Sequence, residues 1–451
     1  MKRKLLLFLL LTTTLDLKAQ CVSKISADGQ HCIVLKSDGT IWTWGNNQFG
    51  QLGNGTYIDS NVPGQITIET NWSQITCGYD STVAVKNDGT MWSWGYNPYG
   101  QLGNGTYIDS NVPVQIGSSN TWSKIAAGSE HGIAIKNDGT IWTWGYNAQG
   151  QLGDGTNITK NSPIQIGTEN NWNKISAGSQ SSYAIKNNGT LWAWGLNQDG
   201  QLGIGNNINK NIPTQIGTDS DWVEIASVGW HTLALKSNGT LWAWGLNFAG
   251  QLGNGNTTSK NTPTQVGTET SWQKIAAGST HSIAIKNNNT LWAWGNNFRG
   301  QLGDGSTTNR TTPVQIGTNT NWGQINGGSA HTIALTLTGS LMTWGNNSFG
   351  ELGNGNNSDS NIPVNINCPN LSIDYFTDNI IKIYPNPAKE IIHFETQETI
   401  IKVEVYDIAG RILSSNSVND NKINLSNLQI GNYILKVYTE NGITNSKIIK
   451  Q

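Results

Sequence analysis

The chain repeats itself with a period of fifty residues. The stretch WGNNQFGQLGNGT at residues 44–56 returns with few changes at 94, 144, 194, 244, 294 and 344, and no insertion interrupts the period. Among the positions that never change in the seven copies are those of Ile25, Gly45, Asn47, Gly50, Leu52, Gly53, Gly55 and Pro63. Such self-similarity indicates one structural unit stacked many times, in which each unit buries its apolar surface against its neighbours.

Each repeat is predicted to contain four short strands. In the third copy, WSKIAAG at 122–128 is a short strand that ends at glycine, and HGIAIK at 131–136 is the continuous apolar run of a strand buried on both faces. The Asn-Asp-Gly turn at 137–139 leads into the alternating TIWTWG. Pro163 starts a fourth strand at a sheet edge, because proline cannot donate to a ladder. Four strands in fifty residues predict a propeller blade. The alternative, an open solenoid, would need polar caps that the terminal copies lack.

The tryptophans follow the same period. Nineteen of the 20 fall at the registers of Trp42, Trp44 and Trp72, and the exception is Trp230. A large apolar side chain at a fixed position in every unit is expected in the core.

The N-terminus is predicted to be a signal peptide. Residues 1–20 combine the basic MKRK, the apolar LLLFLLLTTTL and a plausible cleavage site ending at Gln20. The alternative is a membrane anchor, but the apolar run is shorter than the roughly 20 residues that span a bilayer. No other segment is apolar enough to cross a membrane, so we expect an exported protein.

The repeat itself resembles a known family. WGxNxxGQLGxG, preceded by AxGxxHxxAxxxxGxxWxWG, resembles the regulator of chromosome condensation repeat from residue 22 to about residue 367. The resemblance implies an all-β, seven-bladed β-propeller over residues 21–367 and leaves the function open. The founding member is a nuclear exchange factor for a small GTPase, a role at odds with export, whereas other members are secreted protein-binding propellers.

The composition changes after residue 367. Residues 368–382 are predicted to be a linker, and residues 383–451 show alternating apolar residues with glycine turns, which predicts a small β-sandwich. The segment resembles the C-terminal sorting domain of type IX secretion substrates. The residues that carry this resemblance are Tyr384, Pro385, Asn386, Pro387, Val405, Tyr406, Asp407, Gly410, Gly431, Asn432, Tyr433, Lys447, Ile448, Ile449 and Lys450. It implies a Gram-negative cell, the type IX machinery as a partner, and release from or attachment to the outer cell surface. The alternative is an ordinary adhesive sandwich domain.

Charge and cysteine content narrow the possibilities further. Charged residues make up 12% of the chain and the net charge is −2, so we expect no nucleic-acid partner. Four cysteines in an exported chain allow three disulfide pairings, of which we expect Cys21–Cys368 and Cys32–Cys77.

No motif predicts catalysis, a metal site or a cofactor. Histidine recurs at one register (His31, His131, His231, His281, His331), with Ser81 and Ser181 in the other two copies. Equivalent positions on separate blades cannot all approach one ion to about 2.1 Å, so we expect these side chains to bond neighbouring backbone groups. GQLGNG lacks the lysine and helix of a phosphate loop, and neither GxSxG nor HExxH occurs. An enzyme assembled from unlike blades is the less favoured alternative.

The differences between copies indicate where a ligand could bind. The flanks of the invariant Asn47 vary, as does the loop before the histidine register. Invariant residues beside loop tips whose sequence varies are typical of a binding surface on a rigid scaffold. The alternative is neutral sequence variation at loop tips that are under no constraint. The candidate ligand-binding residues are Phe49, Tyr96, Tyr99, Tyr146, Trp230, Phe248, Phe298, Arg299 and Phe349. The sequence therefore predicts a secreted or surface-attached, non-catalytic propeller that recognises an extracellular protein or glycan. The alternatives are a polymer-degrading enzyme and a purely structural repeat protein.

Overall fold

The computed structural model describes residues 22–366, 381–396, 399–406, 412–416, 421–439 and 442–451. The expected signal peptide at 1–20, Cys21, most of the linker, Cys368, Asp407 and Gly410 lie outside these residues. The chain divides into two compact units, Met1–Pro369 and Asn370–Gln451. The described residues contain strands and no helix.

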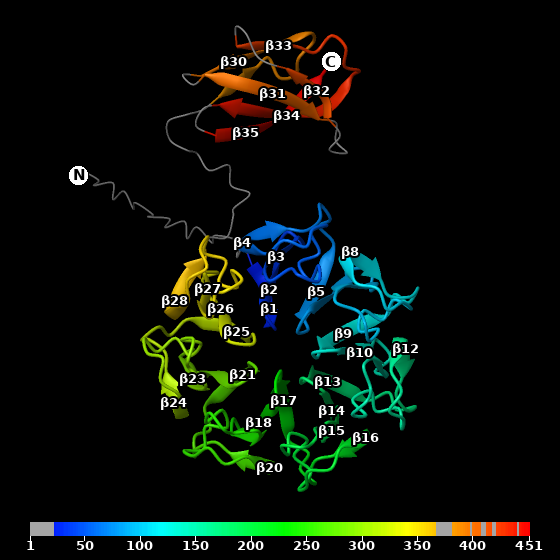
Figure 1. Ribbon diagram of the computed structural model, residues 1–451, viewed down its shortest axis with the longest axis vertical. Coiled ribbons are helices and arrows are strands. Elements are labelled where there is room, and N and C mark those ends of the chain that lie inside the picture. The colour runs from blue at the N-terminus through cyan, green and yellow to red at the C-terminus, as the bar shows by residue number, and fades with distance from the viewer. Residues whose placement is uncertain (1–21, 367–380, 397–398, 407–411, 417–420, 440–441) are drawn as a thin grey trace, which may run out of the picture. The chain divides into compact units, whose positions relative to one another are not determined.

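The first unit is a seven-bladed β-propeller, which confirms the predicted fold (Figure 1). Each blade is an antiparallel sheet of four strands in chain order, from the centre of the ring to its rim. The innermost strands are β1 (Val22–Asp28), β5 (Trp72–Cys77), β9 (Trp122–Ala127), β13 (Trp172–Ala177), β17 (Trp222–Ser227), β21 (Trp272–Ala277) and β25 (Trp322–Gly327). The second strands are β2 (His31–Lys36), β6 (Ser81–Lys86), β10 (His131–Lys136), β14 (Ser181–Lys186), β18 (His231–Lys236), β22 (His281–Lys286) and β26 (His331–Thr336).

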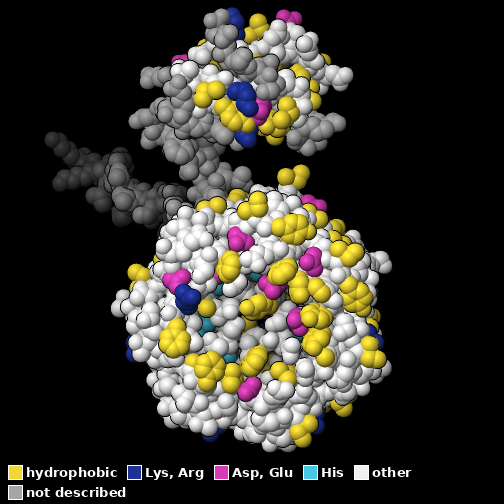
Figure 2. Space-filling model, in the orientation of Figure 1, with side chains coloured by type: hydrophobic (Ala, Val, Ile, Leu, Met, Phe, Trp, Pro, Cys, Tyr) yellow, Lys and Arg dark blue, Asp and Glu magenta, His cyan; other side chains and the backbone are white. Residues whose placement is uncertain are grey.

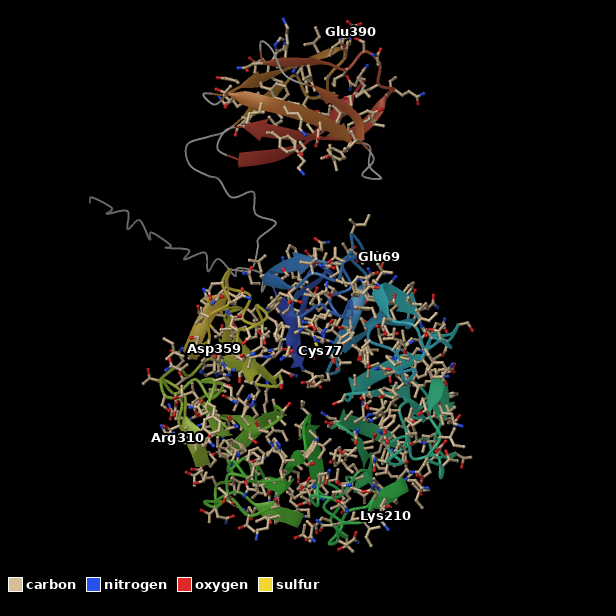
Figure 3. The ribbon with its side chains drawn as sticks, viewed as in Figure 1. Glu69, Cys77, Lys210, Arg310, Asp359 and Glu390 are labelled. Carbon is tan, nitrogen blue, oxygen red and sulfur yellow. The ribbon has the colours of Figure 1, made fainter. Side chains whose placement is uncertain are left out.

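The outer half of each blade holds the tryptophan-rich strand and the edge strand. The third strands are β3 (Ile41–Gly45), β7 (Met91–Gly95), β11 (Ile141–Gly145), β15 (Leu191–Gly195), β19 (Leu241–Gly245), β23 (Leu291–Gly295) and β27 (Leu341–Gly345). The edge strands are β4 (Ser60–Gln65), β8 (Ser110–Gln115), β12 (Lys160–Gln165), β16 (Lys210–Gln215), β20 (Lys260–Gln265), β24 (Arg310–Gln315) and β28 (Ser360–Ile366). In Figure 3, Cys77 at the end of β5 lies near the centre, whereas Lys210 and Arg310, which begin edge strands, lie at the rim.

The edge strands begin earlier than the sequence suggested. In the third blade β12 starts at Lys160, three residues before Pro163, and pairs with Gly145 across a bulge. Proline is tolerated there because this strand has a neighbour on one side only. The second strands are buried along nearly their whole length, as their continuous apolar runs predicted.

One tryptophan per blade packs against the blade before it, and in six blades its indole also donates a hydrogen bond across this contact. Trp94 is fully buried, and its indole Nε1 donates to the Gln51 carbonyl of the preceding blade at 2.9 Å. The same indole lies against Gly53, where a Cβ atom would come within 2.6 Å of Nε1. Gly53 also has φ of +70°, a conformation that glycine adopts without strain. These two requirements explain why Gly53 and Trp44 belong to the invariant or near-invariant part of the repeat.

The ring closes by the same contact, without exchange of a strand. Blade seven is built from β25–β28 and blade one from β1–β4, so neither borrows a strand from the other. Trp44 of blade one donates to the Glu351 carbonyl of blade seven at 2.8 Å, and Gly353 lies against its ring. Strands β1 and β25 are in contact, which completes the circle of inner strands. A closed ring leaves no unit with an exposed face, which is why no polar caps are needed.

The second unit is a small β-sandwich, also as predicted. One sheet has the order β29-β30-β33 and the other β32-β31-β34-β35. The strands are β29 (Lys382–Tyr384), β30 (Ile391–Glu395), β31 (Ile400–Tyr406), β32 (Ile412–Asn416), β33 (Lys422–Asn424), β34 (Gly431–Thr439) and β35 (Gly442–Lys450). Ile392, Phe394, Val403, Val405 and Leu435 form a shared core between the two sheets. Among the described residues no helix has the length and apolar character needed to cross a membrane.

Candidate binding face

One face of the propeller carries both kinds of variable loop. His31 pairs with Gly45, so the turn between β1 and β2 and the long loop after β3 leave each blade at the same end. We call this side the loop face: in each blade it consists of the residues between the first and second strands and those between the third and fourth strands. Figure 2 shows hydrophobic side chains and carboxylates around the central opening on the face turned to the viewer, where Lys and Arg are sparse.

An invariant asparagine holds each long loop in shape. Asn47 is fully buried, its Oδ1 accepts from Leu52 N at 2.9 Å, and its Nδ2 donates to the carbonyl oxygens of Thr56 and Ile58. The Gln51 amide oxygen accepts from Phe49 N at 3.0 Å. Since these bonds fix the backbone on both sides of residues 48 and 49, side chains there can vary without disturbing the loop.

All nine candidate residues lie on the loop face. Tyr99, Trp230, Phe248, Phe298 and Arg299 are exposed, and Phe49, Tyr96, Tyr146 and Phe349 are half-buried. Phe49, Tyr96 and Tyr146 contact aromatic rings of neighbouring blades. The rings of Phe49 and Tyr96 lie 4.5 Å apart and those of Tyr99 and Tyr146 4.9 Å apart. Arg299 pairs with Asp359 of the next blade at 3.2 Å. Their role in ligand binding stays a prediction.

Two of the candidates come together at a cavity. A hollow of about 270 Å³ is lined by Trp230, Phe248, Tyr79, Leu246 and serines of the neighbouring turns. Trp230 and Tyr79 come from first turns of different blades, and Phe248 comes from a long loop. Tyr99 and Phe298 do not line this cavity. Tyr79 was missing from the predicted set, although its place in the variable loop before the histidine register could have indicated it.

Carboxylates lie beside these aromatic residues. Asp80 follows Tyr79, and burial together with the charge of Glu130 raises the pKa of Asp80 to about 6. Burial also raises the pKa of Glu130, and that of Asp28 to about 8, with Asp80 adding to the latter shift. Beneath the face, a second hollow of about 190 Å³ between the inner strands is lined by small residues such as Ser26, Thr76 and Ala126. The loop face is therefore aromatic and acidic around the mouth of a narrow channel.

The histidine register is structural. His231 Nε2 lies 2.8 Å from Ser282 Oγ, and His31, His131 and His281 contact a hydroxyl of the next blade in the same way. The expected bond to a backbone group was wrong in detail, because the next blade places a serine or threonine side chain beside the ring. Burial lowers the pKa of His281 to about 3. Within the described part of the chain, no group of three or more His, Cys, Asp or Glu side chains is arranged to hold a metal ion.

The predicted Cys32–Cys77 disulfide is wrong. Both thiols are free and buried. Cys32 occupies the register that threonine or serine fills in most blades, and its Sγ lies 3.1 Å from His331 Nε2 across the closure of the ring. Cys77 packs with Ile33 and Trp72 in a different cluster. Each sulfur is thus held in its own environment. The Cys21–Cys368 pairing lies outside the described residues.

The comparison with protein families agrees with this geometry. A family model described as the RCC1-like domain matches residues 9–273, more than half of the chain. The chain belongs to the RCC1-like domain family. Models of the regulator of chromosome condensation (RCC1) repeat match further parts of this RCC1-like protein, at residues 272–301 and 324–351 and at 288–335 and 338–381. The resemblance drawn from the repeat motif is thereby confirmed.

Individual relatives of this RCC1-like protein are distant. The ultraviolet-B receptor UVR8 of Arabidopsis thaliana is 36% identical over 64 residues, which is 14% of this chain and 14% of the receptor. Human WBSCR16 is 21% identical, with a TM-score of 0.67 over 74% of this chain and 95% of that chain. Prp20p of Saccharomyces cerevisiae is also 21% identical, with a TM-score of 0.63 over 69% of this chain and 82% of the other. At these identities the structures support the fold alone.

The C-terminal unit has its own match. The secretion system C-terminal sorting domain matches residues 382–451, which confirms the second resemblance. This domain indicates secretion, or attachment at the outer surface, through the type IX system of a Gram-negative cell. The RCC1-like propeller is accordingly the part carried outward, and the sandwich is the part that directs its export.

Proposed function

We propose that this protein is an exported, non-catalytic binding propeller whose ligand docks on the loop face. The observation that carries the proposal is the gathering of side chains that vary between copies: Trp230, Phe248 and Tyr79 line one cavity at the centre of that face. The scaffold beneath is nearly identical from blade to blade, so the differences between blades are concentrated where a ligand has access.

The chemistry of the face favours a protein ligand with basic side chains. Aromatic residues anchor interfaces because they bury large areas at low entropic cost, and they attract cations over their rings. Asp80 and Glu130 add negative charge close by, whereas Arg299 is paired with Asp359. A lysine or arginine that entered the cavity would meet both attractions. A glycan ligand, which could stack on the same rings, is the other outcome that the experiment must distinguish.

The proposal is tested with a double variant and a matched control. Trp230→Ala with Phe248→Ala removes two exposed cavity residues, while Phe298→Ala removes an exposed phenylalanine at the register of Phe248 that does not line the cavity. Full chain is immobilised and probed with extracellular proteins from the same culture and with a glycan array. We expect saturable binding of a basic protein, lost at least tenfold in the double variant and retained in Phe298→Ala, with unchanged melting temperatures.

Two results would contradict the proposal. Equal binding by the double variant and wild type would show that the cavity is not the site. Turnover of a polymer by the purified protein, abolished at one carboxylate, would show an enzyme instead.

A further inference from the structure

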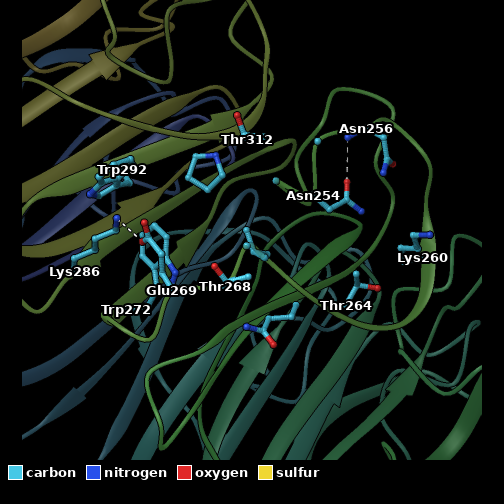
Figure 4. Close-up of a pocket in the computed structure, with 16 residues that line it drawn as sticks. Asn254, Asn256, Lys260, Thr264, Thr268, Glu269, Trp272, Lys286, Trp292 and Thr312 are labelled. Atoms are coloured by element: carbon cyan, nitrogen blue, oxygen red, sulfur yellow. Dashed lines mark hydrogen bonds and ion pairs between the residues drawn. The ribbon is translucent and has the colours of Figure 1, made fainter.

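A further cavity lies between the fifth and sixth blades, separate from the cavity that Trp230 and Phe248 line. It has a volume of about 570 Å³ and is lined by Trp272, Trp292, Lys286 and Glu269 on one side. Asn254, Asn256, Lys260 and Thr264 line the other side (Figure 4). This volume lies within the range of small-molecule sites. None of these residues lines the cavity of Trp230, Phe248 and Tyr79.

One wall of this cavity is a rigid aromatic corner. The rings of Trp272 and Trp292 meet edge to face with centroids 6.0 Å apart. Lys286 Nζ lies 3.6 Å from the centroid of Trp292 and pairs with Glu269 at 2.5 Å. Trp292 is half-buried, so part of its ring is accessible to the cavity. The ion pair neutralises the charge of this wall and leaves oxygen and nitrogen atoms at its edge.

The indole N–H of Trp272 has no partner. Trp272 is 6% exposed, and its Nε1 is buried without a hydrogen bond. A buried indole N–H normally finds an acceptor, because a buried donor without one loses the hydrogen bond that it makes with water in the unfolded chain. This donor has no acceptor within the part of the chain that the structure describes.

The first junction of the ring shows where that donor points. Trp72, the equivalent of Trp272, donates through Nε1 to Thr67 Oγ1 at 3.3 Å. At the register of Thr67 the later junctions carry glycine, at Gly117, Gly167, Gly217, Gly267 and Gly317. A Cβ atom on any of these glycines would meet nothing within 4 Å. The tryptophans that follow them, Trp122, Trp172, Trp222, Trp272 and Trp322, all have an unpartnered Nε1. The hydroxyl of Thr67 therefore has no counterpart at these five junctions, and Gly267 and Thr268 line the cavity.

We infer that the cavity between blades five and six is a carbohydrate-binding site. A pyranose ring presents an apolar face of C–H groups that can pack on the accessible part of Trp292. Its hydroxyl oxygen is an acceptor for Trp272 Nε1–H, and its other hydroxyls meet Asn254, Asn256, Thr264 and Glu269, which offer both donors and acceptors. A purely apolar ligand would leave these groups unsatisfied, and a compact anion would face Glu269. The glycine and the unpartnered indole recur at four further junctions, although at one of them Met342 stands at the register of Trp292.

The test compares two tryptophans that differ only in this free donor. Trp272→Phe removes the unpartnered N–H, and Trp72→Phe removes an N–H that Thr67 already satisfies. Both rings lie 4.8 Å from the lysine of their own blade, so the two changes cost similar packing. The full chain is screened on an array of neutral and acidic oligosaccharides, and the best of these is titrated calorimetrically into wild type and both variants.

We expect wild type to bind, Trp272→Phe to lose one site from the stoichiometry, and Trp72→Phe to keep the wild-type stoichiometry and affinity. Thr264→Val serves as a second variant that does not disturb the core, because valine stands at this register in Val114 and Val314. It should weaken binding at least threefold. The inference is overturned if no oligosaccharide binds, which would leave water as the occupant, or if Trp272→Phe and Trp72→Phe bind alike. Neither result bears on the loop face, since Trp230 and Phe248 are unchanged.

Discussion

Single side chains hold neighbouring blades together through polar contacts between fully buried groups. Five histidines each reach a hydroxyl or thiol on the next blade, and in two blades serine replaces histidine. After Ser81 the next blade offers only Gly132, where any side chain would collide with Trp144. Beside Ser181, the hydroxyl of Tyr183 bonds Ser181 and the Gln201 carbonyl of its own blade, and it also reaches Thr232 of the next blade. Serine thus replaces histidine in one blade that faces a glycine and in another where the tyrosine hydroxyl makes the contact with the next blade.

The buried histidines should make the propeller sensitive to acid. Burial lowers the pKa of His31 and His281 to about 3, and that of His131, His231 and His331 to about 4, from an ordinary value of 6.5. The unfolded chain therefore binds protons more readily, and stability present above pH 6.5 is lost as the pH falls toward 4. The raised pKa values of Asp28, Asp80, Glu130 and Glu351 act in the opposite direction but are fewer.

We expect the free energy of unfolding, measured by urea denaturation, to decrease between pH 6.5 and pH 4.5. In His281→Gln the free energy of unfolding should decrease less steeply, by up to about 1.4 kcal/mol per pH unit. The variant lacks one side chain that takes up a proton when the chain unfolds. An identical slope in wild type and variant would show that His281 does not titrate as its burial implies.

Among the elements, the long loop after each third strand forms the joint between blades. It places a glycine against the tryptophan of the next blade. An asparagine inside the loop provides hydrogen bonds to backbone groups that have no partner strand in this irregular segment. The loop of one blade and the indole of the next therefore pack as a single unit.

Alanine substitutions at two glycines distinguish the effect of this packing from the effect of backbone strain. Gly103 and Gly117 have φ of +65° and +57°, so alanine at either position adopts an unfavourable backbone conformation at a cost of about 1–2 kcal/mol. At Gly103 the new Cβ would also lie 2.7 Å from Trp144 Cδ1, whereas at Gly117 it meets open space. We expect Gly103→Ala to lower the free energy of unfolding by at least about 2 kcal/mol more than Gly117→Ala, as overpacking of a core does. Equal losses in urea denaturation would mean that the indole can move aside.

On the scale of the whole molecule, the propeller and the sandwich are separate in sequence, core and role. The propeller closes on itself through Trp44 and Glu351, and the sandwich has a core of its own. The family matches divide the chain in the same way, with the sorting domain at residues 382–451.

This separation predicts the effect of removing the tail. Deletion of residues 382–451 should leave the thermal unfolding of the propeller within about 2 °C of its transition in the full chain, because a domain with its own core is expected to fold alone. The shortened protein should fail to reach the medium or the cell surface, as judged by fractionation and immunoblotting. Fusion of the same residues to an unrelated exported protein provides the control. Surface delivery of the shortened protein would contradict the sorting role.

Sequence alone determined the architecture. The fifty-residue period, the apolar runs and the Asp-Gly turns are local patterns, and each blade folds from one contiguous stretch, so the strand order could be read without tertiary information. The loop positions of the candidate residues followed for the same reason, because variable and invariant positions alternate within one repeat. The export signals at residues 382–451 were equally local.

Only the tertiary structure decided which residues meet across blades. Cys32 faces His331, and Tyr79 shares a cavity with Trp230 and Phe248, because the ring brings together positions some 150 or 300 residues apart. The difference between Thr67 and Gly267 looks like ordinary loop variation in the sequence, but the structure shows that it leaves the indole N–H of Trp272 without a partner. A repeat specifies its own strands through contacts within fifty residues, but a site between blades depends on how unlike copies are juxtaposed, and that is set by closure of the ring.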